Sequence, residues 1–272
     1  MPKAGSYQTE AIIIKKTKLG EADRILTFYT PDLGKVQGVA KGVRKPKSKM
    51  SGHLELLTYS KVLLTKGRGS LDTITGCQAV ESFLPLKSDL DLCACALYAT
   101  ELVNQFGVER QENRHLFNLL LELMQALSNI PVGSLETAGR LASDGLLRYF
   151  EVHLLEAVGY RPQLQQCVSC RQSLPPASIN YFSISAGGVV CSMCKPKLTF
   201  TYTVSPPVID ALRILQDGGW PSTAQINSDP RLRRELEMLL RNYLRFILER
   251  DIRCTTWLDV LRHDSQSRLD SN

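Results

Sequence analysis

Two short cysteine pairs, Cys167-Val-Ser-Cys170 and Cys191-Ser-Met-Cys194, frame the stretch of sequence that is most informative about the fold. The two-residue gap in each pair lets a tight turn direct both thiolates to one point. Four converging thiolates make a closed tetrahedral site of the kind that binds structural zinc. We therefore predict that Cys167, Cys170, Cys191 and Cys194 hold a structural Zn²⁺. A redox pair or disulfide, or loss of the metal, remain the alternatives.

The residues between the two cysteine pairs predict a hairpin. An alternating run over 179–184 is followed by Ala186-Gly-Gly188 and a second short run, Val189-Val190. This layout is typical of a zinc ribbon, whose own apolar core is so small that the ion is expected to replace it. His153 and Glu156 precede the module but lack the His-Glu-x-x-His pattern of catalytic zinc, so we expect His153 to pack on an apolar helix face.

The composition bounds the class of protein. The chain has 272 residues, of which 43% are hydrophobic, enough for a sizeable core in one or two domains. No run approaches the length of a transmembrane helix, and the first residues lack the apolar segment of a secretory signal, so we expect a cytoplasmic protein with no membrane partner. A reducing compartment also fits the cysteine spacing. The other four cysteines are expected to act as small buried hydrophobes: Cys77, Cys93, Cys95 and Cys254.

Positive charge is concentrated in the first third of the chain. Residues 1–80 carry 14 Lys and Arg against 6 Asp and Glu, a net charge of +8, whereas the remainder carries 19 against 21, a net charge of −2. A basic domain joined to a nearly neutral one suggests an anionic partner for the first and packing or protein contacts for the second.

The first 82 residues predict a small β-barrel. Five strand-like runs alternate with turn residues and leave no room for a helix. We place the runs at Ala11–Ile14, Arg24–Tyr29, Lys35–Ala40, Leu56–Lys66 and Leu71–Val80. Five strands in about 70 residues match the size of an oligonucleotide-binding (OB) fold.

Helical periodicity takes over after Asp89. Apolar residues recur at helical spacing near 90–106, 116–127, 142–157, 208–215 and 232–247. Ser205-Pro206 is expected to cap the fourth of these helices, and Gly159 to end the third. We therefore predict an α+β protein: an OB-fold domain at 1–82, a helical domain at 83–262 with a zinc ribbon inserted at 165–198, and a flexible tail at 263–272.

A cation-rich loop and nearby strand ends are the candidate nucleic-acid site. Cations on a loop between barrel strands contact phosphate oxygens with little sequence preference. The candidate residues are Lys15, Lys16, Arg24, Lys35, Lys41, Arg44, Lys45, Lys47, Lys49, Lys66 and Arg68. The alternative is a solvated loop that protects an edge strand from aggregation. Phe28, Tyr29 and Tyr59 are the aromatic candidates for base stacking, but each is better interpreted as core.

Motifs for common enzyme chemistry are absent from the sequence. There is no Gly-x-x-x-x-Gly-Lys-Ser/Thr nucleotide loop and no Gly-x-Ser-x-Gly elbow, and the four histidines are scattered. Gly67-Arg-Gly-Ser70 is glycine-rich but falls in a predicted strand turn rather than before a helix. We therefore predict no catalytic residues and a binding protein rather than an enzyme.

The order of these parts resembles one bacterial protein family. The pattern from Phe150 through Leu154-Leu155, Gly159-Tyr160-x-Pro162 and Leu164 to Cys167-x-x-Cys170 is similar to the signature of the RecO family of recombination mediators. The opening also resembles that family's N-terminal domain, with Glu10–Ile14, Gly20–Arg24, Gly34-Lys35 and Gly42–Arg44. The C-terminal Ile252-Arg-Cys-Thr255 departs from the usual family ending.

The resemblance implies a function as well as a fold. It implies an OB barrel, a helical domain and a zinc module that together bind single- and double-stranded DNA and anneal complementary strands. It also implies help in loading recombinase, with the partner RecR, onto DNA coated by single-strand-binding protein, through contact with that protein's tail. Association with the nucleoid during repair would follow.

Two other classes of function remain open from the sequence. In one, the protein is mainly an adaptor whose helical domain grips partner tails, with Arg140, Arg148 or Arg241 receiving a carboxylate. In the other, the barrel binds RNA, because positive charge alone does not distinguish RNA from DNA.

Overall fold

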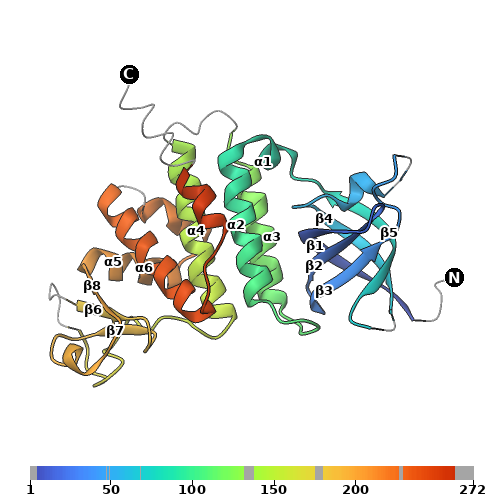
Figure 1. Cartoon of the computed structure of the whole chain (residues 1–272). Helices are drawn as coiled ribbons and strands as arrows, with labels where there is room; N and C mark the ends of the chain where they lie inside the picture. Colours follow the sequence, from blue (N-terminus) through green and yellow to red (C-terminus); the bar gives the residue numbers. More distant parts are fainter. Residues whose placement is uncertain are drawn as a thin grey trace. The chain divides into compact units, whose positions relative to one another are not determined.

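The computed structural model describes residues 5–46, 48, 50–67, 69–131, 138–174, 180–226 and 229–260. The chain forms two compact units, the first built from residues up to 132 together with those from 253 onward, and the second from residues 133–252. Figure 1 shows their elements. The first three helices thus belong to the same compact unit as the barrel. The predicted domain boundary at residue 83 does not coincide with a boundary between the units, and it stays a prediction.

The first unit begins with a closed five-stranded barrel, as the sequence predicts. Its strands are β1 (Ser6–Leu19), β2 (Asp23–Thr30), β3 (Gly34–Ala40), β4 (Tyr59–Thr65) and β5 (Asp72–Glu81). They follow one another around the barrel in the order β1-β2-β3-β5-β4, and β4 closes against β1. All neighbours are antiparallel except β3 and β5. A five-stranded Greek-key barrel of this kind is an OB fold.

Strand β1 closes the barrel because it pairs along its length with two partners. Residues Ser6–Ile12 pair with β4, and Ile12–Leu19 pair with β2. The register with β2 shifts between Ile13 and Lys15. Such a bulge bends and twists a strand, which lets one strand turn the corner of a barrel. The apolar residues Ala11–Ile14 predict this strand but not its earlier start at Ser6, because its polar ends carry no clear alternation.

Both aromatic residues of β2 are core residues: Phe28 belongs to the apolar cluster inside the barrel, and Tyr29 is buried against Gly107 after α2. Phe28 and Tyr29 are almost fully buried, so neither offers a surface for stacking. The ring of Tyr29 also packs beside Gly107, where an added Cβ would lie 2.7 Å from its Cε2 atom. The third aromatic candidate, Tyr59, is half-buried and meets Phe117 edge-on.

The fourth strand begins later than predicted. Leu56 was placed in it, but β4 starts at Tyr59. Leu57 adopts a left-handed backbone conformation with φ of 55° and donates its N–H to the Ile13 carbonyl. The leucine-rich run therefore turns beside β1 before it extends, and a short 3-10 helix, Ser51–Leu54, precedes it. Apolar periodicity does not reveal this turn, because Leu57 is buried and Leu56 is half-buried, as leucines in a strand would be.

Three helices follow the barrel in the first unit: α1 (Leu84–Ser88), α2 (Leu90–Phe106) and α3 (Arg114–Ser128). Residues 254–260, which belong to the same unit, are also helical. Asp89 caps α2, because its carboxylate accepts the N–H groups of Asp91 and Leu92. Asn113 caps α3 through the N–H of Leu116. The apolar faces of α2 and α3 are buried, as their periodicity predicts.

A buried carboxylate links the barrel to the segment between α2 and α3. Asp72 is only 2% exposed and accepts hydrogen bonds from the Tyr7 hydroxyl and, at 2.7 Å, from Arg110. Burial by itself raises the pKa of Asp72, but the Tyr7 and Arg110 hydrogen bonds outweigh it, so the pKa is lowered. Burial and the same hydrogen bond raise the pKa of Tyr7 to about 12. Asp72 is thus held as a carboxylate.

The second unit combines helices with a small sheet. It contains α4 (Ala138–Ala157), β6 (Asn180–Ser183), β7 (Gly188–Val190), a 3-10 helix at Lys195–Lys197, β8 (Thr201–Val204), α5 (Pro206–Asp217), a second 3-10 helix at Trp220–Ile226, and α6 (Pro230–Leu248). The sheet order is β7-β6-β8. The predicted hairpin is present over its described residues, and β8 adds a third strand that the sequence analysis missed.

Ser205 occupies the N-cap position of α5 and Pro206 begins the helix, as the sequence predicts. The Ser205 hydroxyl makes no capping hydrogen bond to the helix; it donates to Glu235 Oε2 at 2.9 Å, and the Ser205 N–H donates to Glu235 Oε1 at 2.9 Å. Glu235 lies on α6, so the residue ties the end of β8 to that helix. None of the helices in the described residues is long and apolar enough to cross a membrane.

Replacing Asp72 with Asn should destabilise the protein by about 2–3 kcal/mol, because two buried hydrogen bonds to a charge are weakened. Urea unfolding at neutral pH measures this loss. A lowered folded-state pKa gives stability that is complete above the unfolded value of about 3.9 and is lost as the pH falls through the folded value. The variant and the parent should therefore converge in acid.

The matched control is Asp32→Asn. Asp32 pairs with Arg114, but both side chains are more than half exposed, so its removal should change stability by less than about 0.5 kcal/mol. Equal effects of the two substitutions would contradict the importance assigned to the buried carboxylate.

Candidate metal centre and nucleic-acid interface

Two tight turns present the four cysteines. In the first, Arg171 N donates to the Cys167 carbonyl at 2.8 Å, and Arg171 has a positive φ of 60°. In the second, the N–H groups of Cys194 and Lys195 both donate to the Cys191 carbonyl at 3.1 Å. Each turn brings its two sulfurs to the same side, as the two-residue spacing predicts.

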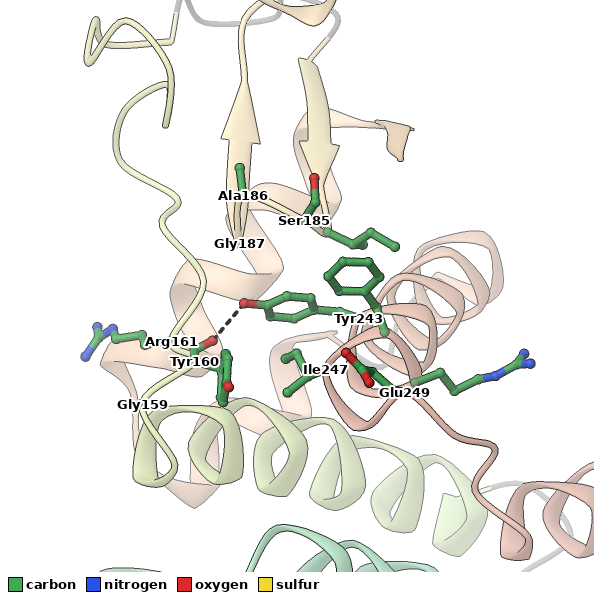
Figure 2. A pocket seen from close by; sticks show the side chains of 12 residues that line it. Gly159, Tyr160, Arg161, Ser185, Ala186, Gly187, Tyr243, Ile247 and Glu249 are labelled. Carbon is green, nitrogen blue, oxygen red and sulfur yellow. Dashed lines mark hydrogen bonds between the residues drawn. The ribbon is translucent and has the colours of Figure 1, made fainter. Parts of the chain in front are cut away.

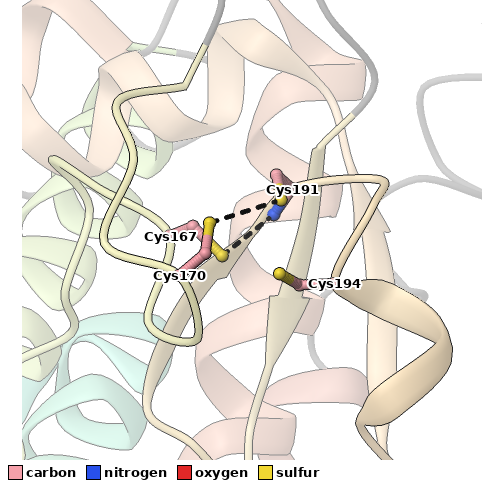
Figure 3. Close-up of side chains that lie close together, drawn as sticks. All are labelled: Cys167, Cys170, Cys191 and Cys194. Carbon is pink, nitrogen blue, oxygen red and sulfur yellow. Dashed lines mark hydrogen bonds between the residues drawn. The ribbon is translucent and has the colours of Figure 1, made fainter.

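The four sulfur atoms converge on one point. They all lie within 4.8 Å of one another, and the Sγ atoms of Cys170 and Cys191 are 3.8 Å apart (Figure 3). In a tetrahedron with metal–sulfur bonds of about 2.3 Å, neighbouring sulfurs are about 3.8 Å apart. The cluster therefore has the size and the donor set for a thiolate-bound metal ion.

The backbone favours the thiolate form of one ligand, Cys167, whereas burial and the neighbouring thiols raise the pKa of Cys191 to about 11. Cys191 N donates to Cys167 Sγ at 3.4 Å. Burial raises the pKa of Cys167, but backbone hydrogen bonds to its sulfur outweigh this and lower the pKa to about 6. A metal must displace protons from its cysteine ligands, so N–H donors that stabilise the thiolate also favour metal binding.

The cysteine module has very little core of its own. Its buried cluster consists of Cys167, Val190 and Cys194 with a few half-buried neighbours. A metal would therefore supply the cross-link between the two turns that apolar packing does not. His153 is not positioned as a ligand, because its Nε2 lies 2.9 Å from the Leu215 carbonyl and its ring stacks on Tyr149. It is a packed histidine, as expected.

Three of the candidate DNA-binding cations gather at one end of the barrel. Lys41, Arg44 and Lys45 are exposed on the segment after β3. This segment is fixed to the β1–β2 turn: Gly42 N donates to Asp23 at 2.7 Å, and Arg44 donates through its N–H to Ala22 and through its guanidinium to Gly20. Ordered backbone thus carries these charges.

Two more candidates share a carboxylate. Lys16 Nζ lies 2.6 Å from Glu55, and Arg24 lies 4.0 Å from the other oxygen of the same group. Glu55 is half exposed, and its carboxylate reduces the net charge of the group formed by Lys16, Arg24 and Glu55 to +1. Lys18 lies directly across from Arg24 and is exposed. The sequence analysis missed Lys18, although the run Lys15-Lys16-Thr-Lys18 was a visible signal.

Three other candidates that the structure describes, Lys15, Lys35 and Lys66, lie elsewhere on the barrel. Lys35 donates to the Asn104 carbonyl at 2.8 Å, at the start of β3 rather than its end. Lys15 is exposed within β1, and Lys66 is exposed just after β4. Lys47, Lys49 and Arg68 lie outside the described residues.

The arginines proposed to receive a partner's carboxylate are largely engaged. Arg148 is 5% exposed and pairs with the fully buried Glu151 at 3.1 Å, so the prediction that it meets a partner is wrong. Arg241 pairs with Glu237 at 2.7 Å on the same helix. Arg140 is half-buried. These positions weaken the adaptor hypothesis in the form in which the sequence suggested it.

The second unit also contains an open cavity of about 610 Å³. Tyr160, Ile184, Tyr243 and Phe246 line it, and the Tyr243 hydroxyl donates to the Tyr160 carbonyl at 3.1 Å (Figure 2). A Cβ added at Gly187 would lie 2.8 Å from this hydroxyl. The Gly159-Tyr160 motif of the sequence signature therefore helps to build this wall.

Comparison with known proteins covers nearly the whole chain. Residues 3–83 match the family model described as "Recombination protein O N terminal", and residues 87–254 match "Recombination protein O C terminal". The chain is 43% identical over 262 residues to the DNA repair protein RecO of Dehalococcoides mccartyi strain CBDB1, which covers 96% of this chain and 98% of the relative. It is 40% identical over 256 residues to the protein of that name from Roseiflexus sp. strain RS-1, covering 94% and 86%. The corresponding values for Pelotomaculum thermopropionicum are 33% over 253 residues, with 93% of each chain covered.

Substitution of Cys191 by Ser should remove the metal. We expect about one equivalent of bound metal in the parent and little in the variant, because a structural site needs all four thiolates. Elemental analysis by mass spectrometry gives the amount and the identity of the metal, and thermal unfolding should show a loss of stability. Cys77→Ser is the control, since this cysteine lies in β5 and outside the cluster. Retention of metal by Cys191→Ser would contradict the assignment.

Proposed function

The chain belongs to the RecO family of DNA repair proteins, and from this premise we propose that it is a recombination mediator that binds single- and double-stranded DNA and anneals complementary strands. The observation that carries the proposal is the cluster of Lys41, Arg44 and Lys45 at one end of an OB barrel, on backbone anchored to the β1–β2 turn. Such a barrel commonly binds oligonucleotides through its loops.

The mechanism that we propose is charge neutralisation. Two complementary strands repel each other through their phosphates, and bound cations lower that repulsion while they release counterions. Because contacts to phosphate carry no sequence information, binding should depend little on base sequence. The main-chain bonds from Gly42 and Arg44 keep the cations in place before DNA arrives, so less ordering is needed on binding.

We further propose that the ion held by the four cysteines is zinc and that it acts structurally. Four thiolates complete a tetrahedral shell, so no coordination position remains for a substrate. In this family context we also propose RecR and the tail of single-strand-binding protein as partners, with recombinase loading on coated strands as the outcome. The DNA-binding residues and the contacts with these partners are likewise parts of this proposal.

Reversing three charges together, Lys41→Glu, Arg44→Glu and Lys45→Glu, should weaken DNA binding similarly for unrelated sequences. Fluorescence anisotropy with labelled single strands between about 50 and 200 mM salt should show a steep fall in affinity for the parent. The triple variant should have a slope of log K against log salt that is smaller by about 2, at about 0.7 per lost phosphate contact.

Lys61→Glu provides the control, because Lys61 is an exposed cation on β4 and is not one of the proposed contacts. A salt response that is flat in the parent, or a control that loses as much affinity as the triple variant, would overturn the proposed site. Competition by a matched RNA strand distinguishes DNA binding from the RNA alternative.

Annealing should separate the roles of the two sites. In an assay with complementary fluorescent strands, the triple variant should anneal slowly while retaining its metal. Treatment of the parent with a chelator should destabilise the cysteine module. The annealing rate should then fall only if the second unit contributes to annealing. Unchanged annealing by the triple variant would count against charge neutralisation on the barrel.

A further inference from the structure

The three-stranded sheet of the second unit protects one of its edges and leaves the other open. At the β7 edge, Val189 donates its N–H to the Gln163 carbonyl at 2.9 Å, and its carbonyl accepts the N–H of Val168 at 2.9 Å. The opposite edge is β8, and within the described residues it pairs only with β6. Proteins generally cover or blunt such edges, because they are templates for strand addition.

The register defines which backbone groups of β8 face outward. Ile184 N donates to the Phe200 carbonyl at 3.2 Å, just before β8, and the pairing continues with Phe182 opposite Tyr202. In an antiparallel pair, residues that exchange hydrogen bonds alternate with residues that do not. Thr201 and Thr203 therefore direct their N–H and C=O groups away from β6, toward the open edge.

Apolar side chains continue from this edge onto α6. Tyr202 and Met238 line a small hollow of about 80 Å³ between β8 and the helix, and Met238 is 57% exposed. Phe200 is 64% exposed and lies 6.1 Å, centroid to centroid, from Phe246. Phe246 also lines the cavity of about 610 Å³. Aromatic residues and Met arranged in this way are typical of protein-binding surfaces.

Positive charge lies at the other end of the same edge. Glu235 binds Ser205, the residue that follows β8. Arg231 and Arg234 are exposed in the turn of α6 that precedes Glu235. The edge therefore passes from cations near Ser205 to aromatic side chains near Phe200.

We propose that β8 accepts an extended segment of a partner protein as a fourth strand. The segment would form backbone hydrogen bonds to Thr201 and Thr203, place large apolar side chains at alternate positions against Met238 and Phe246, and carry acidic residues over Arg231 and Arg234. Strand addition draws its affinity from the main chain and its specificity from pockets for alternate side chains. The site is separate from the metal and from the barrel cations, and it does not rest on the proposed DNA function.

The chemistry of the edge favours a polypeptide over a nucleic acid. Thr201 and Thr203 offer alternating donors and acceptors at the spacing of a β-strand, which a peptide backbone matches with donors and acceptors of its own. A sugar–phosphate backbone supplies acceptors but no matching N–H donors. A cationic end next to an apolar end is likewise complementary to an acidic and apolar segment.

The test uses the full-length protein, without DNA, and a fluorescein-labelled peptide of about ten residues, the usual length of a long strand. The peptide has three aspartates followed by alternating threonine and phenylalanine, and its C-terminus is amidated so that recognition of a free carboxylate cannot explain binding. We expect saturable binding in fluorescence anisotropy. Thr203→Pro, which removes an outward N–H, should weaken it by about tenfold or more, whereas Thr203→Val, which keeps the N–H, should not.

Met238→Glu gives a second, surface variant that should also weaken binding about tenfold if Thr203→Pro fails to fold. Folding of each variant is checked by metal content and thermal unfolding. Equal binding by the parent, Thr203→Pro and Met238→Glu would overturn the proposal, as would equal loss in Thr203→Val. Displacement of the peptide by an oligothymidylate strand, or a concentration-dependent dimer in sedimentation that Thr203→Pro abolishes, would assign the edge to another occupant and also overturn it.

Discussion

The double pairing of β1 is the constraint on which the first unit depends. One strand of fourteen residues pairs with β4 through its first half and with β2 through its second half, and the register shift between Ile13 and Lys15 lets it bend between them. The barrel also closes between β3 and β5, which pair only through Gly38 with Asp72 and Val39 with Thr73. This pairing does not cover the rest of the facing edges of β3 and β5. Protection of a strand edge therefore stays an alternative role for the basic loop that follows β3.

The small sheet of the second unit is held together in a different way from the barrel. It is too short to close on itself, and its buried cluster is little more than Cys167, Val190 and Cys194. A metal ion held by the convergent sulfurs would supply the cross-link, and the segment on both sides of Cys167 covers the β7 edge through Gln163 and Val168. The cysteine cluster and the covered edge are therefore parts of one arrangement, because the same chain segment contributes to both.

Much of this architecture could be predicted from the sequence, for identifiable physical reasons. The geometry of each Cys-x-x-Cys pair depends only on the few residues of its own turn. The helices are predicted by apolar residues that recur at helical spacing, and the buried faces of α2 and α3 confirm them. The features that escaped prediction depend on distant partners. Strand β8 is only four residues long and is defined by β6. Ser205 occupies the N-cap position of α5, but the sequence does not reveal that its hydroxyl donates to Glu235 of α6.

The sequence also cannot show which of the positive charges in the first third of the chain are available for binding. A count of cations marks residues 1–80 as basic, but it treats each Lys and Arg alike. In the structure, Lys16 and Arg24 face Glu55, and Lys35 is committed to a carbonyl. Lys41, Arg44 and Lys45 lie instead on a segment whose own hydrogen bonds are made by the main chain of the β1–β2 turn and by Asp23. Because a phosphate competes best for a cation that no carboxylate already holds, the loop after β3 is one part of the barrel where exposed positive charge is available to an anionic partner.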